Sequence, residues 1–79
     1  MMKLNVRYFG LVAEAAGKQQ EILEFSEGVS AAELLTQLVK KYHIPDAESV
    51  QVAVNQNLDK NAVLKDGDEV ALLPPFAGG

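Results

Sequence analysis

The chain has 79 residues, 48% of them hydrophobic and 23% charged, which is the balance of one small folded domain. It contains no cysteine, which excludes disulfides, thiolate metal sites and cysteine nucleophiles. The formal net charge of −4 disfavours nucleic-acid binding, and no stretch approaches the roughly 18 apolar residues of a membrane span. The N-terminus lacks a signal-peptide apolar run, so we expect a cytoplasmic protein.

Alternation of polar and apolar residues predicts a first strand over residues 3–9. Leu4, Val6 and Tyr8 then face the core, whereas Phe9 faces the opposite side. The next segment, residues 11–16, consists of good helix formers and is followed by Gly17, which predicts a helix of one or two turns. A second strand is predicted over residues 19–25.

The main helix has the clearest local signal in the chain. Ser30 and Glu33 form an S-x-x-E capping box, and Val29 and Leu34 occupy the positions of a hydrophobic staple. Pro45 ends the helix by the preceding residue at the latest. An apolar stripe at helical spacing, expected to pack on a sheet, comprises Leu34, Leu35, Leu38, Val39 and Tyr42.

The remaining segments predict short strands. Residues 50–54 alternate as a strand, residues 55–57 are turn-prone, and Leu58 begins a short return strand of a hairpin. We expect a loop with a brief helical turn over residues 60–65 and a last strand over residues 69–73. The order predicts an α+β protein in which one main helix covers one face of a small mixed sheet. A ubiquitin-like β-grasp fits this order and size, as do other small α+β folds.

The face of the sheet away from the main helix is also expected to be apolar near its end. Phe9, Ala71 and Leu73 point to that face by alternation, and Leu58 can join them at the hairpin. Contiguous exposed apolar surface usually marks a protein interface. The alternative is that these residues fill the edge of the core.

Other polar residues give no sign of catalysis. His43 is the one histidine and has no cysteine, serine or carboxylate neighbour at motif spacing. Asp66, Asp68 and Glu69 favour a turn over a cation site, because an EF-hand-type loop needs a longer series of ligands. No nucleotide-binding or zinc spacing occurs either. The chain alone therefore has no recognisable catalytic apparatus.

The end of the sequence predicts an extended tail, residues 74–79, after a domain formed by residues 1–73. Pro74 and Pro75 restrict the backbone and favour extended geometry. Gly78 and Gly79 lack a Cβ and fit a channel barely wider than the main chain. The alternative is a frayed, glycine-rich end without a role.

Four segments together resemble the small subunit of molybdopterin synthase, and the resemblance spans nearly the whole chain. They are residues 6–11 (VRYFGL), 52–56 (VAVNQ), 66–70 (DGDEV) and 74–79 (PPFAGG). The resemblance implies a ubiquitin-like sulfur carrier without a bound cofactor. An ATP-dependent activating enzyme would adenylate Gly79, and a sulfur donor protein would supply the sulfur of a thiocarboxylate. On this resemblance, the carrier would not be an enzyme on its own.

The resemblance also implies a partner and the residues that bind it. The tail would enter the large subunit of a heterotetramer, whose active site passes the sulfur to a cyclic pyranopterin precursor in molybdenum cofactor biosynthesis. Gly78 and Gly79 would be the reacting end. The partner-binding residues would be Phe9, Leu58, Leu73, Pro74, Pro75, Phe76 and Ala77. Some members carry a basic residue in the short helix where this chain has Ala13, so partner contacts there are not carried over.

Three other functions fit parts of the sequence. A sulfur carrier of the thiamine pathway shares the fold and Gly-Gly, but it usually lacks the Pro-Pro pair. A ubiquitin-like modifier would use the same acyl adenylate to acylate lysines of other proteins. A non-covalent binding module would not need Gly78 and Gly79.

Overall fold

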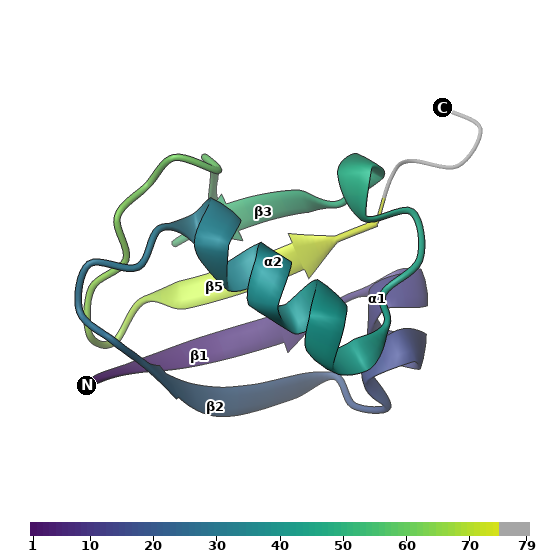
Figure 1. Ribbon diagram of the computed structural model, residues 1–79, viewed down its shortest axis with the longest axis horizontal. Coiled ribbons are helices and arrows are strands. Elements are labelled where there is room, and N and C mark those ends of the chain that lie inside the picture. The colour runs from purple at the N-terminus through teal and green to yellow at the C-terminus, as the bar shows by residue number, and fades with distance from the viewer. Residues whose placement is uncertain (75–79) are drawn as a thin grey trace.

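The computed structural model describes residues 1–74 and shows a five-stranded sheet with α2 lying across one face (Figure 1). The elements are β1 (Met2–Tyr8), α1 (Gly10–Ala16), β2 (Gln20–Phe25), α2 (Ala31–Tyr42), the 3-10 helix η1 (Ala47–Ser49), β3 (Gln51–Val54), β4 (Asn57–Leu58) and β5 (Glu69–Leu73). The expectations for Pro75, Phe76, Ala77, Gly78 and Gly79 lie outside the described residues.

The strands lie in the order β2-β1-β5-β3-β4. β1 and β5 are parallel, with Tyr8 opposite Leu72, and the other neighbouring pairs are antiparallel. This mixed sheet with one covering helix is a ubiquitin-like β-grasp, which confirms the predicted α+β class. Because β1 and β5 run in the same direction, both strands end at the same edge of the sheet.

The core lies between α2 and the facing side of the sheet. Burial alternates along β1, where Leu4, Val6 and Tyr8 are buried and their neighbours exposed, as the sequence predicts. The buried residues of α2 that join the same core are Ala31, Leu34, Leu35 and Leu38. Each fully buried aliphatic side chain contributes about 1.5–3 kcal/mol relative to an exposed one. None of the helices in the described residues has the length and apolarity needed to cross a membrane.

The capping box fixes the start of α2. Ser30 Oγ accepts from the Glu33 amide at 3.2 Å, and a Glu33 carboxylate oxygen accepts from the Ser30 amide at 3.0 Å. The helix ends at Tyr42, and His43 follows in the left-handed region with a φ of 54°. Both boundaries agree with the sequence prediction, and His43 serves as the C-cap.

The loop predicted over residues 60–65 is confirmed, but it contains a turn at residues 60 and 61 and no helical segment. The amides of Ala31 and Ala32 donate to the carbonyls of Ala62 and Lys60, each at 2.9 Å. Val63 also forms an isolated bridge with Ser30. The carbonyls that a local helix would use therefore satisfy the first amides of α2, which a helix leaves without intrahelical partners.

Two sequence segments behind the family resemblance lie side by side in the fold. The side-chain Nδ2 of Asn55 donates to an Asp68 carboxylate oxygen at 3.0 Å, and Asn55 Oδ1 accepts from the Glu69 backbone amide at 3.0 Å. Asp68 also accepts from the Lys65 amide at 2.8 Å. The acidic segment therefore forms the turn before β5, as the turn interpretation predicts, and hydrogen bonds attach this turn to Asn55, the residue after β3.

Candidate functional site

The sheet face opposite α2 carries a row of small and apolar side chains. Ala53 of β3 pairs with Leu58 of β4 on one side and with Ala71 of β5 on the other, and Ala71 pairs with Arg7 of β1. Directly paired residues point to the same face, so these side chains share the outer face. Leu58 is 63% exposed, whereas Ala53 is buried between its neighbours.

Phe9 extends this surface towards the end of the sheet. The predicted strand was shifted by one residue, because β1 runs from Met2 to Tyr8 and Phe9 is the extended N-cap of α1. The Phe9 amide still donates to the Leu72 carbonyl at 3.2 Å, which places Phe9 beside the last residues of β5. Its ring is 39% exposed, and the Arg7 guanidinium lies 5.8 Å from the ring centroid.

We call Phe9, Ala53, Leu58, Ala71 and Leu73 the outer apolar patch. Arg7 borders the patch and forms an ion pair with Glu69 at 3.6 Å. A shallow hollow of about 280 Å³ lies beside Phe9, lined by Arg7, Tyr8, Phe9, Gly10, Ala13, Gln19 and Gln20. The predicted apolar residues Phe9, Leu58 and Leu73 thus share one face, which the Arg7–Glu69 ion pair borders.

The patch ends where the predicted tail begins. Leu73 is the last residue of β5, and Pro74 follows it directly. Pro74 lies against the backbone of Gly10, at the start of α1. Of the predicted tail residues only Pro74 is described, and the roles expected for the residues after it stay predictions.

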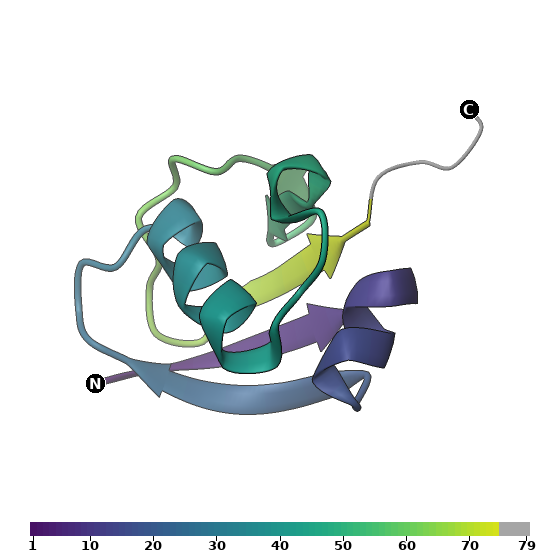
Figure 2. The same ribbon diagram turned by 45° about the vertical axis from the view of Figure 1, so that its right-hand side comes forward.

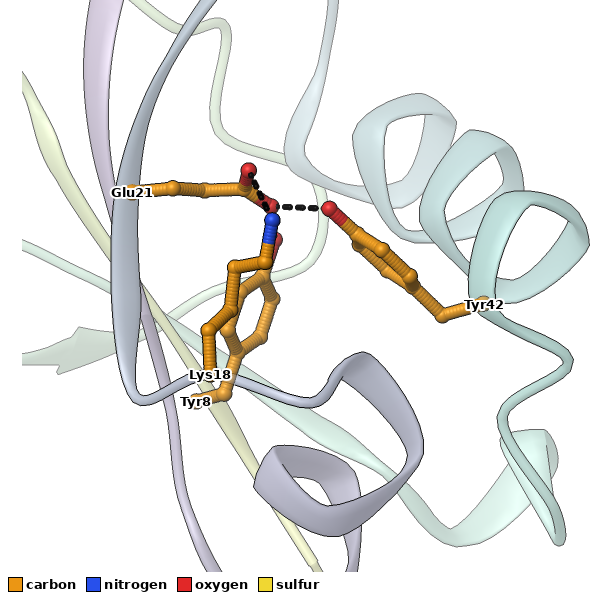
Figure 3. Close-up of polar contacts among 4 residues, drawn as sticks. All are labelled: Tyr8, Lys18, Glu21 and Tyr42. Carbon is orange, nitrogen blue, oxygen red and sulfur yellow. Dashed lines mark hydrogen bonds and ion pairs between the residues drawn. The ribbon is translucent and has the colours of Figure 1, made fainter.

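A cluster of polar side chains on the other face was not predicted from the sequence. Figure 3 shows the hydroxyls of Tyr8 and Tyr42 and the Lys18 ammonium directed at the Glu21 carboxylate. Burial opposes ionisation of Glu21, but hydrogen bonds from Tyr42, Tyr8 and Lys18 outweigh it and lower the pKa of Glu21 below its ordinary 4.5. Burial and the bond to Glu21 raise the pKa of Tyr8 well above its ordinary value. These contacts link β1, β2 and the end of α2, so their role is structural. We call the cluster formed by Tyr8, Lys18, Glu21 and Tyr42 the clasp.

Sequence reasoning did not count two residues of the outer face as part of the candidate site. Alternation within residues 50–54 could have placed Ala53 on that face, because Val52 and Val54 are core residues. Alternation over residues 3–9 did place Arg7 on the same side as Phe9, but it gave no reason to assign Arg7 to an interface. Neither residue signals an interface by its type alone.

Known proteins resemble the chain along its whole length. A model described as the ThiS family matches residues 6–79. The molybdopterin synthase sulfur carrier subunit of Mycobacterium tuberculosis is 45% identical, with 100% of both chains covered. Solved structures also share the fold, and two of them are described next.

The first solved structure is the complex of subunits 1 and 2 of the molybdopterin-converting factor from Helicobacter pylori. It has a TM-score of 0.62 and 28% identity, with 99% of this chain and 100% of that chain covered. The second is the small archaeal modifier protein 1 from Methanosarcina acetivorans, with a TM-score of 0.75, 27% identity and 100% and 98% coverage. The chain therefore belongs to the ThiS family, which it shares with molybdopterin synthase sulfur carrier subunits.

Proposed function

We propose that the chain carries sulfur as a thiocarboxylate on Gly79 and donates it to a cyclic pyranopterin precursor in the active site of a molybdopterin synthase large subunit. The observation that carries this proposal is the position of the outer apolar patch, which ends at Leu73, immediately before Pro74 and the Gly-Gly tail. A docking surface beside the tail would deliver Gly79 to a defined place on the partner. The identity to the sulfur carrier subunit from Mycobacterium tuberculosis supports the same function.

The chemistry requires no nucleophilic side chain from the carrier. A carboxylate is a poor electrophile, so an activating enzyme would first join it to the AMP part of ATP and release pyrophosphate. Sulfide sulfur from a donor protein would then attack the acyl carbon and displace AMP, leaving the thiocarboxylate. The absence of cysteine is compatible with this route, because the sulfur is attached to the main-chain terminus.

The carrier would contribute positioning rather than catalytic groups. Phe9, Leu58 and Leu73 would pack on the large subunit, with Arg7 at the border of the interface. Buried aromatic residues at the centre of an interface often contribute most of its binding energy. The formal charge of −4 would favour a partner with a basic surface. Both proteins would meet in the cytoplasm.

A single-turnover reaction tests the proposal. The thiocarboxylated chain would be mixed with the large subunit and the cyclic pyranopterin precursor, and the mass of the chain and the dithiolene product would be followed together. We expect the chain to return to its carboxylate form as dithiolene appears. A stable thiocarboxylate in the presence of a competent large subunit would contradict the proposal. Transfer to a thiazole precursor instead would support the thiamine-pathway alternative.

The likeness to a small archaeal modifier protein favours protein modification as a second candidate function. The same acyl adenylate could be attacked by a lysine amine, which forms an isopeptide bond and releases AMP. Conjugates that disappear on deletion of Gly79 would support this candidate. A chain whose function survives deletion of Gly78 and Gly79 would instead be a non-covalent binding module.

A further inference from the structure

Gly10 lies against the residue at which the chain leaves the sheet. A Cβ added to Gly10 would come within 2.8 Å of Pro74 Cγ, a distance that real Cβ atoms essentially never show. Gly10 also has a φ of +55°, which L side chains rarely adopt. Two features of this position therefore favour glycine, the backbone conformation and above all the closeness of the proline ring.

The closeness is specific to Gly10 among the described glycines. Gly17, Gly28 and Gly67 also have positive φ angles, between 75° and 88°, but a Cβ on any of them would meet nothing within 4 Å. The conformation alone thus recurs at turns throughout the fold. Only the position that faces Pro74 combines it with a steric requirement.

The same junction holds the end of β5 at a second point. The Phe9 amide donates to the Leu72 carbonyl at 3.2 Å. Phe9 directly precedes Gly10, and Leu72 lies two residues before Pro74. Figure 2 shows α1 beginning beside the end of β5, as expected where two parallel strands leave the sheet at one edge. A hydrogen bond and a ring contact together hold the end of β5 and Pro74 against the start of α1.

We propose that Gly10 is a positioning residue for the tail. Because Gly10 has no side chain, the Pro74 ring can pack against its backbone, and this packing sets the direction in which residues 75–79 leave the domain. The effect on sulfur transfer rests on the proposed function, because the starting direction of the tail matters only if the tail must reach a partner's active site. A side chain at position 10 would displace Pro74 and re-aim the tail. The outer apolar patch would still dock, and Gly79 would reach the reacting position less often.

A double-mutant cycle tests this role in sulfur transfer. The proteins are the unmodified chain, Gly10→Ala, Pro74→Ala and the double variant, with Gly17→Ala as a control that has the same backbone strain without a steric neighbour. We expect Gly10→Ala to lower kcat for transfer by about tenfold, with the KM for the large subunit nearly unchanged, because small misplacements of reacting groups are costly. Pro74→Ala removes Cγ, the atom nearest the added Cβ. In the Pro74→Ala background, the loss of kcat caused by Gly10→Ala should therefore be no larger than the loss caused by Gly17→Ala.

A spectroscopic measurement tests the direction of the tail without any sulfur chemistry. The chain has no cysteine, so nitroxide labels can be attached specifically at Gln37→Cys on the exposed face of α2 and at Ala77→Cys in the tail. We expect Gly10→Ala to shift the distance distribution between the labels by electron paramagnetic resonance. Gly17→Ala should leave the distribution unchanged, and in chains that already carry Pro74→Ala the further change Gly10→Ala should shift it no more.

The two measurements separate failure of this inference from failure of the proposed function. If the unmodified chain transfers no sulfur, the proposed function is wrong and the label distances alone decide the role of Gly10. An unchanged distance distribution in Gly10→Ala would overturn the inference. Equal losses of kcat in Gly10→Ala and Gly17→Ala, or an equal loss with and without the Pro74 ring, would overturn it as well.

Discussion

The hydroxyls of Tyr8 and Tyr42 donate to the same carboxylate oxygen of Glu21, and the two rings meet edge to face with centroids 5.9 Å apart. Tyr8 is the last residue of β1 and Tyr42 the last residue of α2. The shared acceptor thus links β1 to the end of the covering helix α2. The Lys18 ammonium, 3.2 Å from the other Glu21 oxygen, completes the clasp.

Replacing the charged acceptor should destabilise the fold. In Glu21→Gln the two hydroxyls and Lys18 lose a carboxylate, and hydrogen bonds to charged groups are stronger than neutral ones. We expect the free energy of unfolding to fall by about 1–2 kcal/mol in urea denaturation. The matched control is Glu24→Gln on the same strand, where the side chain is exposed and little change is expected. Equal stabilities of the two variants would contradict the role of the clasp.

The clasp should also make stability depend on acid pH. The pKa of Glu21 is lower in the folded chain than its ordinary 4.5, so the unfolded state binds more protons between these two values. The contribution of Glu21 is therefore fully present above its unfolded pKa and is lost as the pH falls through the lowered folded value. We expect the stability difference between the unmodified chain and Glu21→Gln to shrink below the ordinary pKa. A difference that stays constant during acid titration would contradict this prediction.

A charge on the outer apolar patch should weaken partner binding. Phe9→Asp places a carboxylate beside Arg7 on the exposed face, where the core is not disturbed. If Phe9 is an interface anchor, the Kd for the large subunit should rise by about 30-fold, as for a residue worth about 2 kcal/mol. Calorimetric titration measures this change. Ile22→Asp is the control, because Ile22 is 71% exposed on the same face but pairs with polar Asn5 outside the patch.

Extending the chain by one residue after Gly79 should separate docking from activation. The added residue moves the carboxylate away from the position where the activating enzyme would adenylate it. We expect no adenylation, measured as ATP-dependent pyrophosphate release, while the affinity for the large subunit through the outer apolar patch falls by less than about tenfold. Normal sulfur transfer by the extended chain would contradict the terminal-carboxylate mechanism.

Local signals in the sequence were sufficient to predict most elements. The Ser30–Glu33 capping box and the residues before Pro45 predicted α2 correctly, because these contacts join residues close in sequence. Alternation predicted which residues of β1 and β5 face the core. The same alternation placed Phe9 and Leu73 on the outer face, although β1 itself ends one residue earlier than expected.

Contacts between distant segments could not be predicted in the same way. The segment over residues 60–65 has local sequence that allows a helical turn, but its carbonyls accept from the amides of Ala31 and Ala32. The clasp at Glu21 depends on bringing together β1, β2 and α2. Gly10 lies just before the helix predicted over residues 11–16, and nothing local in the sequence indicates that the parallel pairing of β1 and β5 places Pro74 against it.

The central claim is that Gly79 carries sulfur, and the intact mass of the chain tests it most directly. The chain would be weighed before and after incubation with ATP, an activating enzyme and a sulfur source, and the C-terminal peptide would be weighed separately. We predict a mass increase equal to one oxygen replaced by one sulfur, confined to that peptide. An unchanged mass, with the chain instead attached to other proteins, would contradict the sulfur-carrier account.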